Sequence, residues 1–199
     1  MKVLIVGAHG TIGTAVAEEL EDDATVVKAS RNSSEVKVDM TSIESIKNMF
    51  KQVGEVDALI CTAGAAHFGY VPDMTPEDNQ VAVESKLLGQ INLVLLGMDY
   101  VKDNGSITLV TGILMDDPIL KGASSAMANG GVRAFVKSAA MEMPRNIRIN
   151  SVSPTMLEEA KEKYGPLFQG YEPVKGKSVA LAFRKSVFGG QTGQSYNVY

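Results

Sequence analysis

The chain has 199 residues, of which 45% are hydrophobic and 21% are charged. This composition is typical of a globular protein, and the length fits one domain, residues 1–199, with a sizeable core. A net charge of −4 argues against nucleic acid or an anionic membrane as a main partner, and one cysteine with two histidines offers no metal-ligand cluster.

Cellular location is read from the apolar segments and from Cys61. The first predicted strand starts at residue 2, which leaves no room for a signal peptide. No apolar stretch approaches the ~20 residues of a membrane span, because residues 87–98 are interrupted by glycine and amide side chains. Cys61 lies in an apolar run and is expected to be a buried thiol in a reducing compartment. We therefore expect a cytoplasmic protein.

The first twenty residues combine a strand, a glycine-rich turn and a helix. Residues 2–6 (KVLIV) form a continuous apolar run, typical of a strand buried on both faces. Gly7, Gly10 and Gly13 follow in a G-x-x-G-x-x-G spacing and lead into an amphipathic helix. In a dinucleotide site these glycines would allow a tight turn, close approach of a pyrophosphate and close packing of helix on strand. A plain structural turn is the alternative interpretation.

The second strand, predicted at residues 24–29, is followed by the segment that selects the cofactor. An NAD site usually has an acidic residue here to bind the ribose 2′-hydroxyl. Residues 30–34 (SRNSS) contain no acid, and Arg31 would suit a 2′-phosphate. NADP is therefore favoured over NAD, the alternative being a solvated surface arginine.

The rest of the chain alternates strands and helices, which predicts a parallel sheet covered on both faces. Strands are expected at residues 35–38, 56–61, 106–111, 147–152 and 195–198. Helices are expected at about residues 42–53, 81–100, 126–143 and 175–187, with Thr75 capping a short helix and a turn at Asn104-Gly105. Residues 156–173 are more polar and are interpreted as a helix with a mobile lid.

In this order, the segments resemble the short-chain dehydrogenase/reductase family. The matching stretches are GAHGTIG (7–13), VDMTS (38–42), CTAG (61–64), NGSITLVTG (104–112), RINSVSPT (148–155) and TGQSYNV (192–198). The resemblance implies a Rossmann-type α/β fold: a doubly wound parallel sheet of about seven strands, in the order 3-2-1-4-5-6-7, with helices on both faces.

The resemblance also implies where the cofactor binds. The pyrophosphate would meet the glycine-rich turn, and the 2′-phosphate would meet Arg31 and Ser30. Asp39 and Met40 would flank the adenine, while Ala63 and Gly64 would line the nearby ribose. The implied cofactor residues are Gly7, His9, Gly10, Thr11, Ile12, Gly13, Ser30, Arg31, Asp39, Met40, Ala63 and Gly64.

The catalytic positions of the family are not retained. Family enzymes use a tyrosine as acid/base, a lysine four residues later, a serine about thirteen residues before the tyrosine, and an asparagine from the preceding long helix. The corresponding residues here are Ser125, Asn129, Gly112 and Lys86. The catalytic residues therefore stay unassigned. Five residues are candidate substitutes for the missing acid/base: Lys86, Tyr164, Tyr171, His67 and Tyr70. For each of them, the alternative interpretation is a surface polar residue or a residue that only lines the cleft.

Two functions are consistent with this pattern. The first is an NADP(H)-dependent oxidoreductase that acts on a small carbonyl or alcohol through a non-standard acid/base. The second is a catalytically inactive NADP(H)-binding sensor or scaffold, and a site completed by a partner chain is a third possibility. The expected partners are a small-molecule substrate or none, with no nucleic acid and no membrane. Members of the family commonly pack their two long helices against a second copy of the chain. The resemblance therefore implies a homodimer or homotetramer.

Overall fold

The sheet has the predicted topology. The computed structural model describes residues 1–32 and 35–199, and in them seven parallel strands are ordered β3-β2-β1-β4-β5-β6-β7. The strands are β1 (Lys2–Val6), β2 (Thr25–Ser30), β3 (Val36–Lys37), β4 (Val56–Cys61), β5 (Val101–Val110), β6 (Arg148–Pro154) and β7 (Ser195–Val198). The chain order reverses direction at β1, between β2 and β4.

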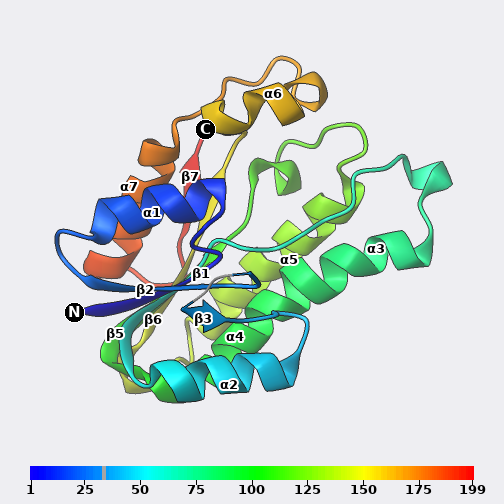
Figure 1. Cartoon of the computed structure of the whole chain (residues 1–199). Coiled ribbons are helices and arrows are strands. Elements are labelled where there is room, and N and C mark those ends of the chain that lie inside the picture. Colours follow the sequence, from blue (N-terminus) through cyan, green and yellow to red (C-terminus); the bar gives the residue numbers. More distant parts are fainter. Residues whose placement is uncertain (33–34) are drawn as a thin grey trace.

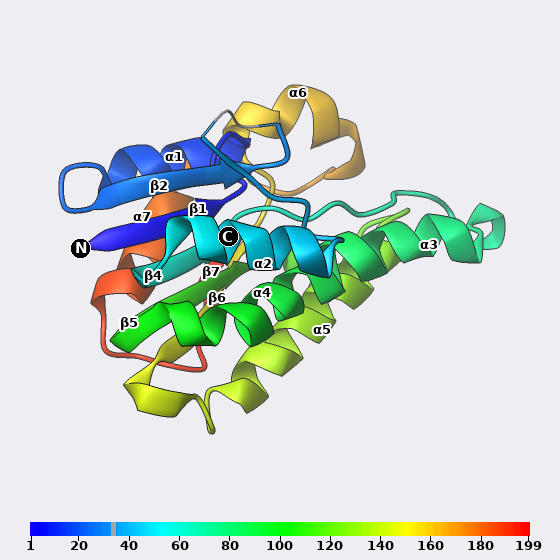
Figure 2. The same ribbon diagram turned by 60° about the horizontal axis from the view of Figure 1, so that its bottom comes forward.

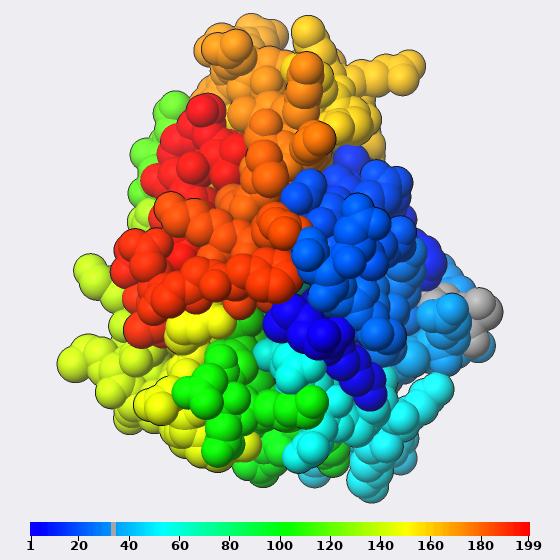
Figure 3. Space-filling view, turned by 90° about the vertical axis from the view of Figure 1, so that its left-hand side faces the viewer, coloured from blue at the N-terminus to red at the C-terminus, as the bar shows by residue number. Residues whose placement is uncertain are grey.

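Helices cover both faces of this sheet (Figure 1). On one face lie α1 (Thr11–Leu20) and α7 (Gly176–Phe188), which contact each other directly (Figure 3). On the other face lie α2 (Ile43–Val53), α3 (Pro76–Ala82), α4 (Gly89–Gly97) and α5 (Ala123–Ala139) (Figure 2). The four-residue α6 (Lys161–Tyr164) belongs to the lid, and short 3-10 turns lie at Val71–Asp73, Met98–Tyr100, Ile113–Met115, Pro144–Asn146, Glu158–Ala160 and Gly165–Leu167.

Two hydrophobic cores result, one on each face of the sheet. Leu4 and Val6 of β1 join the core under α2, α4 and α5, while Val3 and Ile5 join the core under α1 and α7. Successive side chains of a strand point to opposite faces. A strand buried on both faces must therefore be continuously apolar, and this explains the KVLIV run.

The long helix differs from its predicted form. It begins at Pro76, where Thr75 and Asp78 form a capping box, and it runs through a π-helical segment, Val83–Leu88, into α4. By length and composition alone, the helical stretch Pro76–Tyr100 is apolar enough to cross a membrane. In this fold it packs along α5 and the sheet, as helices of a protein core do.

Two other elements have bounds that differ from the predicted ones. The turn predicted at Asn104-Gly105 is wrong, because β5 already begins at Val101. The pairing of β5 with β4 shifts its register between Val56 and Ala58, and this irregularity accommodates the longer strand. A Cβ at Gly105 would lie 2.7 Å from the Asp57 carbonyl oxygen, so glycine permits this close pairing. Helix α5 ends at Ala139 rather than at residue 143, in keeping with the bias against helix ahead of Pro144.

We expect Phe183→Ala to destabilise the fold strongly. Phe183 of α7 is fully buried between the helix and the sheet, and removal of a buried ring typically costs ~3–5 kcal/mol. Phe188, one turn further along α7, is 47% exposed, so Phe188→Ala is the matched control and should change the unfolding free energy by less than ~1 kcal/mol. Urea denaturation measures both. Similar losses in the two variants would contradict the placement of α7.

Candidate cofactor and substrate site

Two adjoining cavities lie at the carboxyl edge of the sheet. The first, called here the loop cavity, has a volume of about 330 Å³ and lies between the glycine-rich turn and the end of β2. The second, the lid cavity, has a volume of about 460 Å³ and lies under residues 156–168 of the lid. They share Thr62, Gly64 and Ala65 at the end of β4, so a single extended ligand can occupy both.

The glycine-rich turn has the backbone geometry of a phosphate cradle. Gly7 has φ +88°, which disfavours any side chain, and a Cβ on Gly13 would lie 2.1 Å from the Gly7 carbonyl oxygen. Helix α1 therefore starts directly against the turn. Its N-cap, Gly10, supplies no side-chain hydrogen bond, so the first N–H groups of the helix are left for an anion.

The structure brings most of the predicted cofactor residues to these cavities. The loop cavity is lined by Gly7, Gly10, Ser30, Arg31, Met40, Ala63 and Gly64, and the lid cavity by Thr11, Ile12 and Gly64. Gly13 is buried behind the turn, where it acts through packing. Exposed His9 and half-buried Asp39 line neither cavity. Of the predicted selectivity segment, residues 33 and 34 lie outside the described residues.

The carboxylate of Asp39 has a local structural role. It accepts hydrogen bonds from the Thr41 N–H at 3.0 Å and from the Thr41 hydroxyl at 2.8 Å. These bonds, with a smaller contribution from the charge of Arg31, lower the pKa of Asp39. Asp39 therefore shapes the turn that carries Met40 into the loop cavity.

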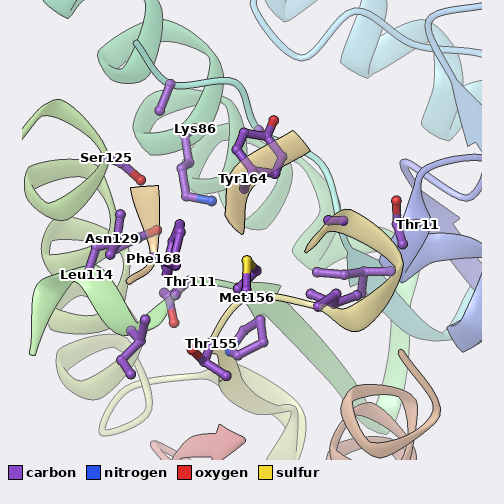
Figure 4. A pocket seen from close by; sticks show the side chains of 18 of the residues that line it. Thr11, Lys86, Thr111, Leu114, Ser125, Asn129, Thr155, Met156, Tyr164 and Phe168 are labelled. Carbon is purple, nitrogen blue, oxygen red and sulfur yellow. The ribbon is translucent and has the colours of Figure 1, made fainter. Parts of the chain in front are cut away.

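Lys86 extends its amine into the lid cavity (Figure 4). Burial lowers the pKa of this lysine to about 8. No described side chain or carbonyl forms a hydrogen bond or ion pair with its amine. The lid cavity thus contains a cationic group without a partner, which can give up a proton near neutral pH.

The π-helical segment positions Lys86. Its wider turn leaves the Lys86 carbonyl to accept a hydrogen bond from the Gln90 side chain at 3.1 Å. Gln90 is fully buried and also pairs with both backbone groups of Val110, at 2.9 Å each. At Gly64 (φ +148°) a Cβ would lie 2.8 Å from the Lys86 Cγ, so only glycine lets the lysine stem pass. π-Bulges of this kind are frequent at functional sites.

The three other family catalytic positions also line the lid cavity. Ser125 and Asn129 lie near each other on α5 (Figure 4), and Gly112 follows the end of β5. Asn129 is 2% exposed and its Oδ1 has no hydrogen-bond partner. A Cβ at Gly112 would lie 3.2 Å from the Asn129 Nδ2. Because Gly112 has no side chain, the Asn129 amide has the space that it occupies.

Among the other candidate substitutes, only Tyr164 reaches the lid cavity. His67 lies 3.8 Å from the Asp78 carboxylate, and the Tyr70 ring lies under Lys121. The Tyr171 hydroxyl donates to the Asp117 carbonyl at 3.1 Å, and burial raises its pKa. These three line neither cavity.

Sequence reasoning missed the residues that support the site. Besides Gln90, they are Ser85, whose hydroxyl accepts from the Ala65 N–H at 3.0 Å, and Thr62, whose hydroxyl donates to the Gly7 carbonyl at 3.1 Å. Thr62 ties the end of β4 to the glycine-rich turn. The sequence offered one signal for this support, which is Gln90 within the apolar part of the long helix. A buried amide side chain requires hydrogen-bond partners.

Comparison with known proteins identifies the family. A family model described as enoyl-(acyl carrier protein) reductase matches residues 7–180. The chain belongs to the short-chain dehydrogenase/reductase family.

Relatives in this family share about a quarter of their residues with the chain. The 3-oxoacyl-[acyl-carrier-protein] reductase FabG of Rickettsia bellii is 26% identical over 173 residues, covering 78% of this chain and 72% of the relative. The trihydroxynaphthalene reductase of Colletotrichum orbiculare is 26% identical over 147 residues, covering 69% and 51%. The chain therefore spans about half the length of that relative.

Solved structures share the fold. The protein lin1944 from Listeria innocua has a TM-score of 0.99 and 59% identity, with 100% of both chains covered. A small-chain dehydrogenase solved in complex with NADPH has a TM-score of 0.89 and 26% identity, covering 100% of this chain and 96% of that one.

Proposed function

We propose that this short-chain dehydrogenase/reductase is an NADP(H)-dependent oxidoreductase of a small carbonyl or alcohol, with Lys86 as its acid/base. One observation carries the proposal: Lys86 is an unpartnered amine with a lowered pKa, in the cavity where the four family catalytic positions meet. The nicotinamide of the cofactor supplies or accepts the hydride when bound. The cytoplasm is the compartment we propose.

The residues of the two cavities fit such a cofactor. The open backbone cradle at Gly7 and Gly10 suits a pyrophosphate. Exposed Arg31 lines the loop cavity at the end of β2 and suits a 2′-phosphate, which a guanidinium can bind through two parallel hydrogen bonds. Support for NADP also comes from the NADPH in the 26% identical small-chain dehydrogenase.

Lys86 is suited to move a proton in both directions. In reduction, its ammonium would donate to the oxygen that becomes negative as hydride arrives. In oxidation, its free amine would accept the proton of the alcohol. A pKa of about 8 keeps both forms accessible near neutral pH, which is the condition for efficient general acid–base catalysis.

Binding without turnover is the second candidate function. It is favoured by the replacements at Gly112, Ser125 and Asn129, none of which supplies a phenol or an ammonium. Fold alone does not confer chemistry when the reacting groups have changed. NADPH binding with no consumption across a broad carbonyl and alcohol screen would favour this candidate.

We also propose self-association through α4 and α5. Val81, Leu88 and Leu95 recur every seven residues along the long helix and are 44%, 43% and 55% exposed. On neighbouring α5, a Cβ at Gly130 would meet nothing within 4 Å. An exposed apolar stripe beside an open glycine would allow two helix pairs to approach closely.

Arg31→Ala should weaken NADPH binding and leave NADH binding nearly unchanged. Loss of charge-assisted hydrogen bonds worth ~1.5–3 kcal/mol corresponds to about 10- to 100-fold in Kd. Calorimetric titration of cofactor-free protein measures both ligands, and Lys47→Ala, an exposed lysine of α2, controls for the loss of one positive charge. Equal weakening of NADH, or wild-type binding of NADH as tight as that of NADPH, would contradict the 2′-phosphate assignment.

Lys86→Met should lower kcat by about 10²- to 10⁴-fold, the usual contribution of a general acid, without changing NADPH affinity. In the wild type, carbonyl reduction needs the ammonium, so its rate should fall tenfold per pH unit above a pKa of about 8. Alcohol oxidation should rise through the same pH.

Lys86→Arg is the matched control for charge, because a guanidinium stays protonated and cannot transfer the proton. It should be slow and should lack the pH step. Wild-type activity in either variant would remove Lys86 from the chemistry.

Leu95→Glu should shift the protein towards monomer, because a buried unpaired carboxylate opposes association. Sedimentation velocity at several concentrations measures the distribution. Met141→Glu, at a residue 90% exposed just beyond α5, is the control and should leave it unchanged. A wild type that sediments as a monomer would refute the proposed interface.

A further inference from the structure

The lid cavity has one charged donor for an oxygen that becomes negative, beside neutral donors such as the Thr155 hydroxyl and the Asn129 amide. Gly112 has no side chain, and the Thr111 hydroxyl is already engaged with the Val152 carbonyl at 3.2 Å. Ser125 is recessed on α5 and only 7% exposed. Lys86 is the one cation among the residues lining the cavity. A substrate that concentrates charge on a single oxygen would therefore depend mainly on this one cation.

A conjugated substrate makes a smaller demand. Hydride addition to an isolated ketone gives an alkoxide, a base comparable to hydroxide, whose conjugate acid water has a pKa of ~15.7. Reduction of a quinone instead gives a phenolate-type anion, whose conjugate acid resembles tyrosine, with a pKa of ~10. Because this anion spreads its charge over a ring, one nearby ammonium can replace a set of hydroxyl donors.

The walls of the cavity suit a flat ring. Phe68, from the segment after β4, and Tyr164, from α6, pack with ring centroids 6.1 Å apart. Phe168 adds a third half-buried ring and is held by an edge contact with Tyr171 at 5.4 Å. Tyr164 and Phe168 enter from the lid on the side to which the Lys86 amine extends (Figure 4). Aromatic rings prefer such offset or edge-on partners.

We infer that the substrate is a quinone, held among the rings of Phe68, Tyr164 and Phe168 and protonated by Lys86. This inference rests on the proposed function and specifies its substrate class. The reaction balances as quinone plus NADPH plus one proton giving hydroquinone plus NADP⁺. The hydride carries both electrons and one hydrogen, the carbonyl π bonds are lost, and Lys86 supplies the second hydrogen and is reprotonated from solvent.

The test compares two probes with the same bicyclic frame, 1,4-naphthoquinone and 1-tetralone. We expect kcat/KM for the quinone to exceed that for the ketone by at least 100-fold after subtraction of the protein-free rate. One NADPH should be consumed for each hydroquinone formed. Lys86→Met should lower the quinone rate at least 100-fold.

Binding gives a second readout that does not depend on turnover. Phe168→Ala should raise the Kd of 1,4-naphthoquinone for the NADP⁺-loaded protein about tenfold by calorimetry. Tyr164→Phe, which keeps the ring and removes only the hydroxyl, is the matched control and should leave the Kd unchanged. The thermal midpoints of both variants should be measured to verify folding.

The outcomes separate this inference from the proposed function. If 1-tetralone is reduced faster than the quinone, the substrate class is wrong and the oxidoreductase proposal stands. If the quinone binds but is not reduced, the inference is also overturned. If NADPH binds and neither probe nor a broader carbonyl screen shows turnover, the proposed function fails as well.

Discussion

The buried side chain of Gln90 fixes the geometry on which the candidate site depends. Its amide pairs with the N–H and the carbonyl of Val110 and also reaches the Lys86 carbonyl. The long helix is thereby held to the end of β5 and is kept in a π-helical turn at the same place. A buried backbone group left without a hydrogen-bond partner costs ~1–3 kcal/mol. A shift of the helix would remove the Gln90 partner from three backbone groups at once, namely the Val110 N–H, the Val110 carbonyl and the Lys86 carbonyl. Lys86 is therefore presented to the cavity by a rigid support.

Two glycines adjoin the polar residues that stand at the family catalytic positions. Gly64 leaves the space through which the Lys86 stem passes, and a side chain there would collide with it. Gly112 leaves the space beside the Asn129 amide. Lys86 and Asn129 thus each have a glycine at a point of close contact. Gly64 belongs to a stretch that matches the family, whereas Gly112 is itself a replacement, so Gly112 and Asn129 are the pair of replaced residues that fit each other.

Much of the fold could be predicted because its signals are local. The apolar run of β1, the glycine spacing before α1 and the cap at Thr75 each report on their own segment. The strand order came with the family resemblance. The π-helical segment and the early start of β5 were missed because they depend on partners distant in sequence. Gln90 finds its buried partners in Val110, and Gly105 is needed in part because Asp57 lies opposite. Periodicity cannot report such contacts.

The candidate site was likewise predictable only in part, and the reason is chemical. Cofactor recognition relies on backbone groups and glycines, whose positions a sequence motif records directly. The proton transfer that we propose relies on the environment of one amine. The sequence places Lys86 near the cavity, but its pKa of about 8 arises from the surrounding burial and the absence of a neighbouring carboxylate among the residues lining the cavity. An exposed lysine with its usual pKa of ~10.4 would hold its proton too tightly to act near neutral pH. The same desolvation that lowers this pKa also strengthens the interaction of the ammonium with a developing anion, so one half-buried lysine can provide both an acid and a stabilising charge.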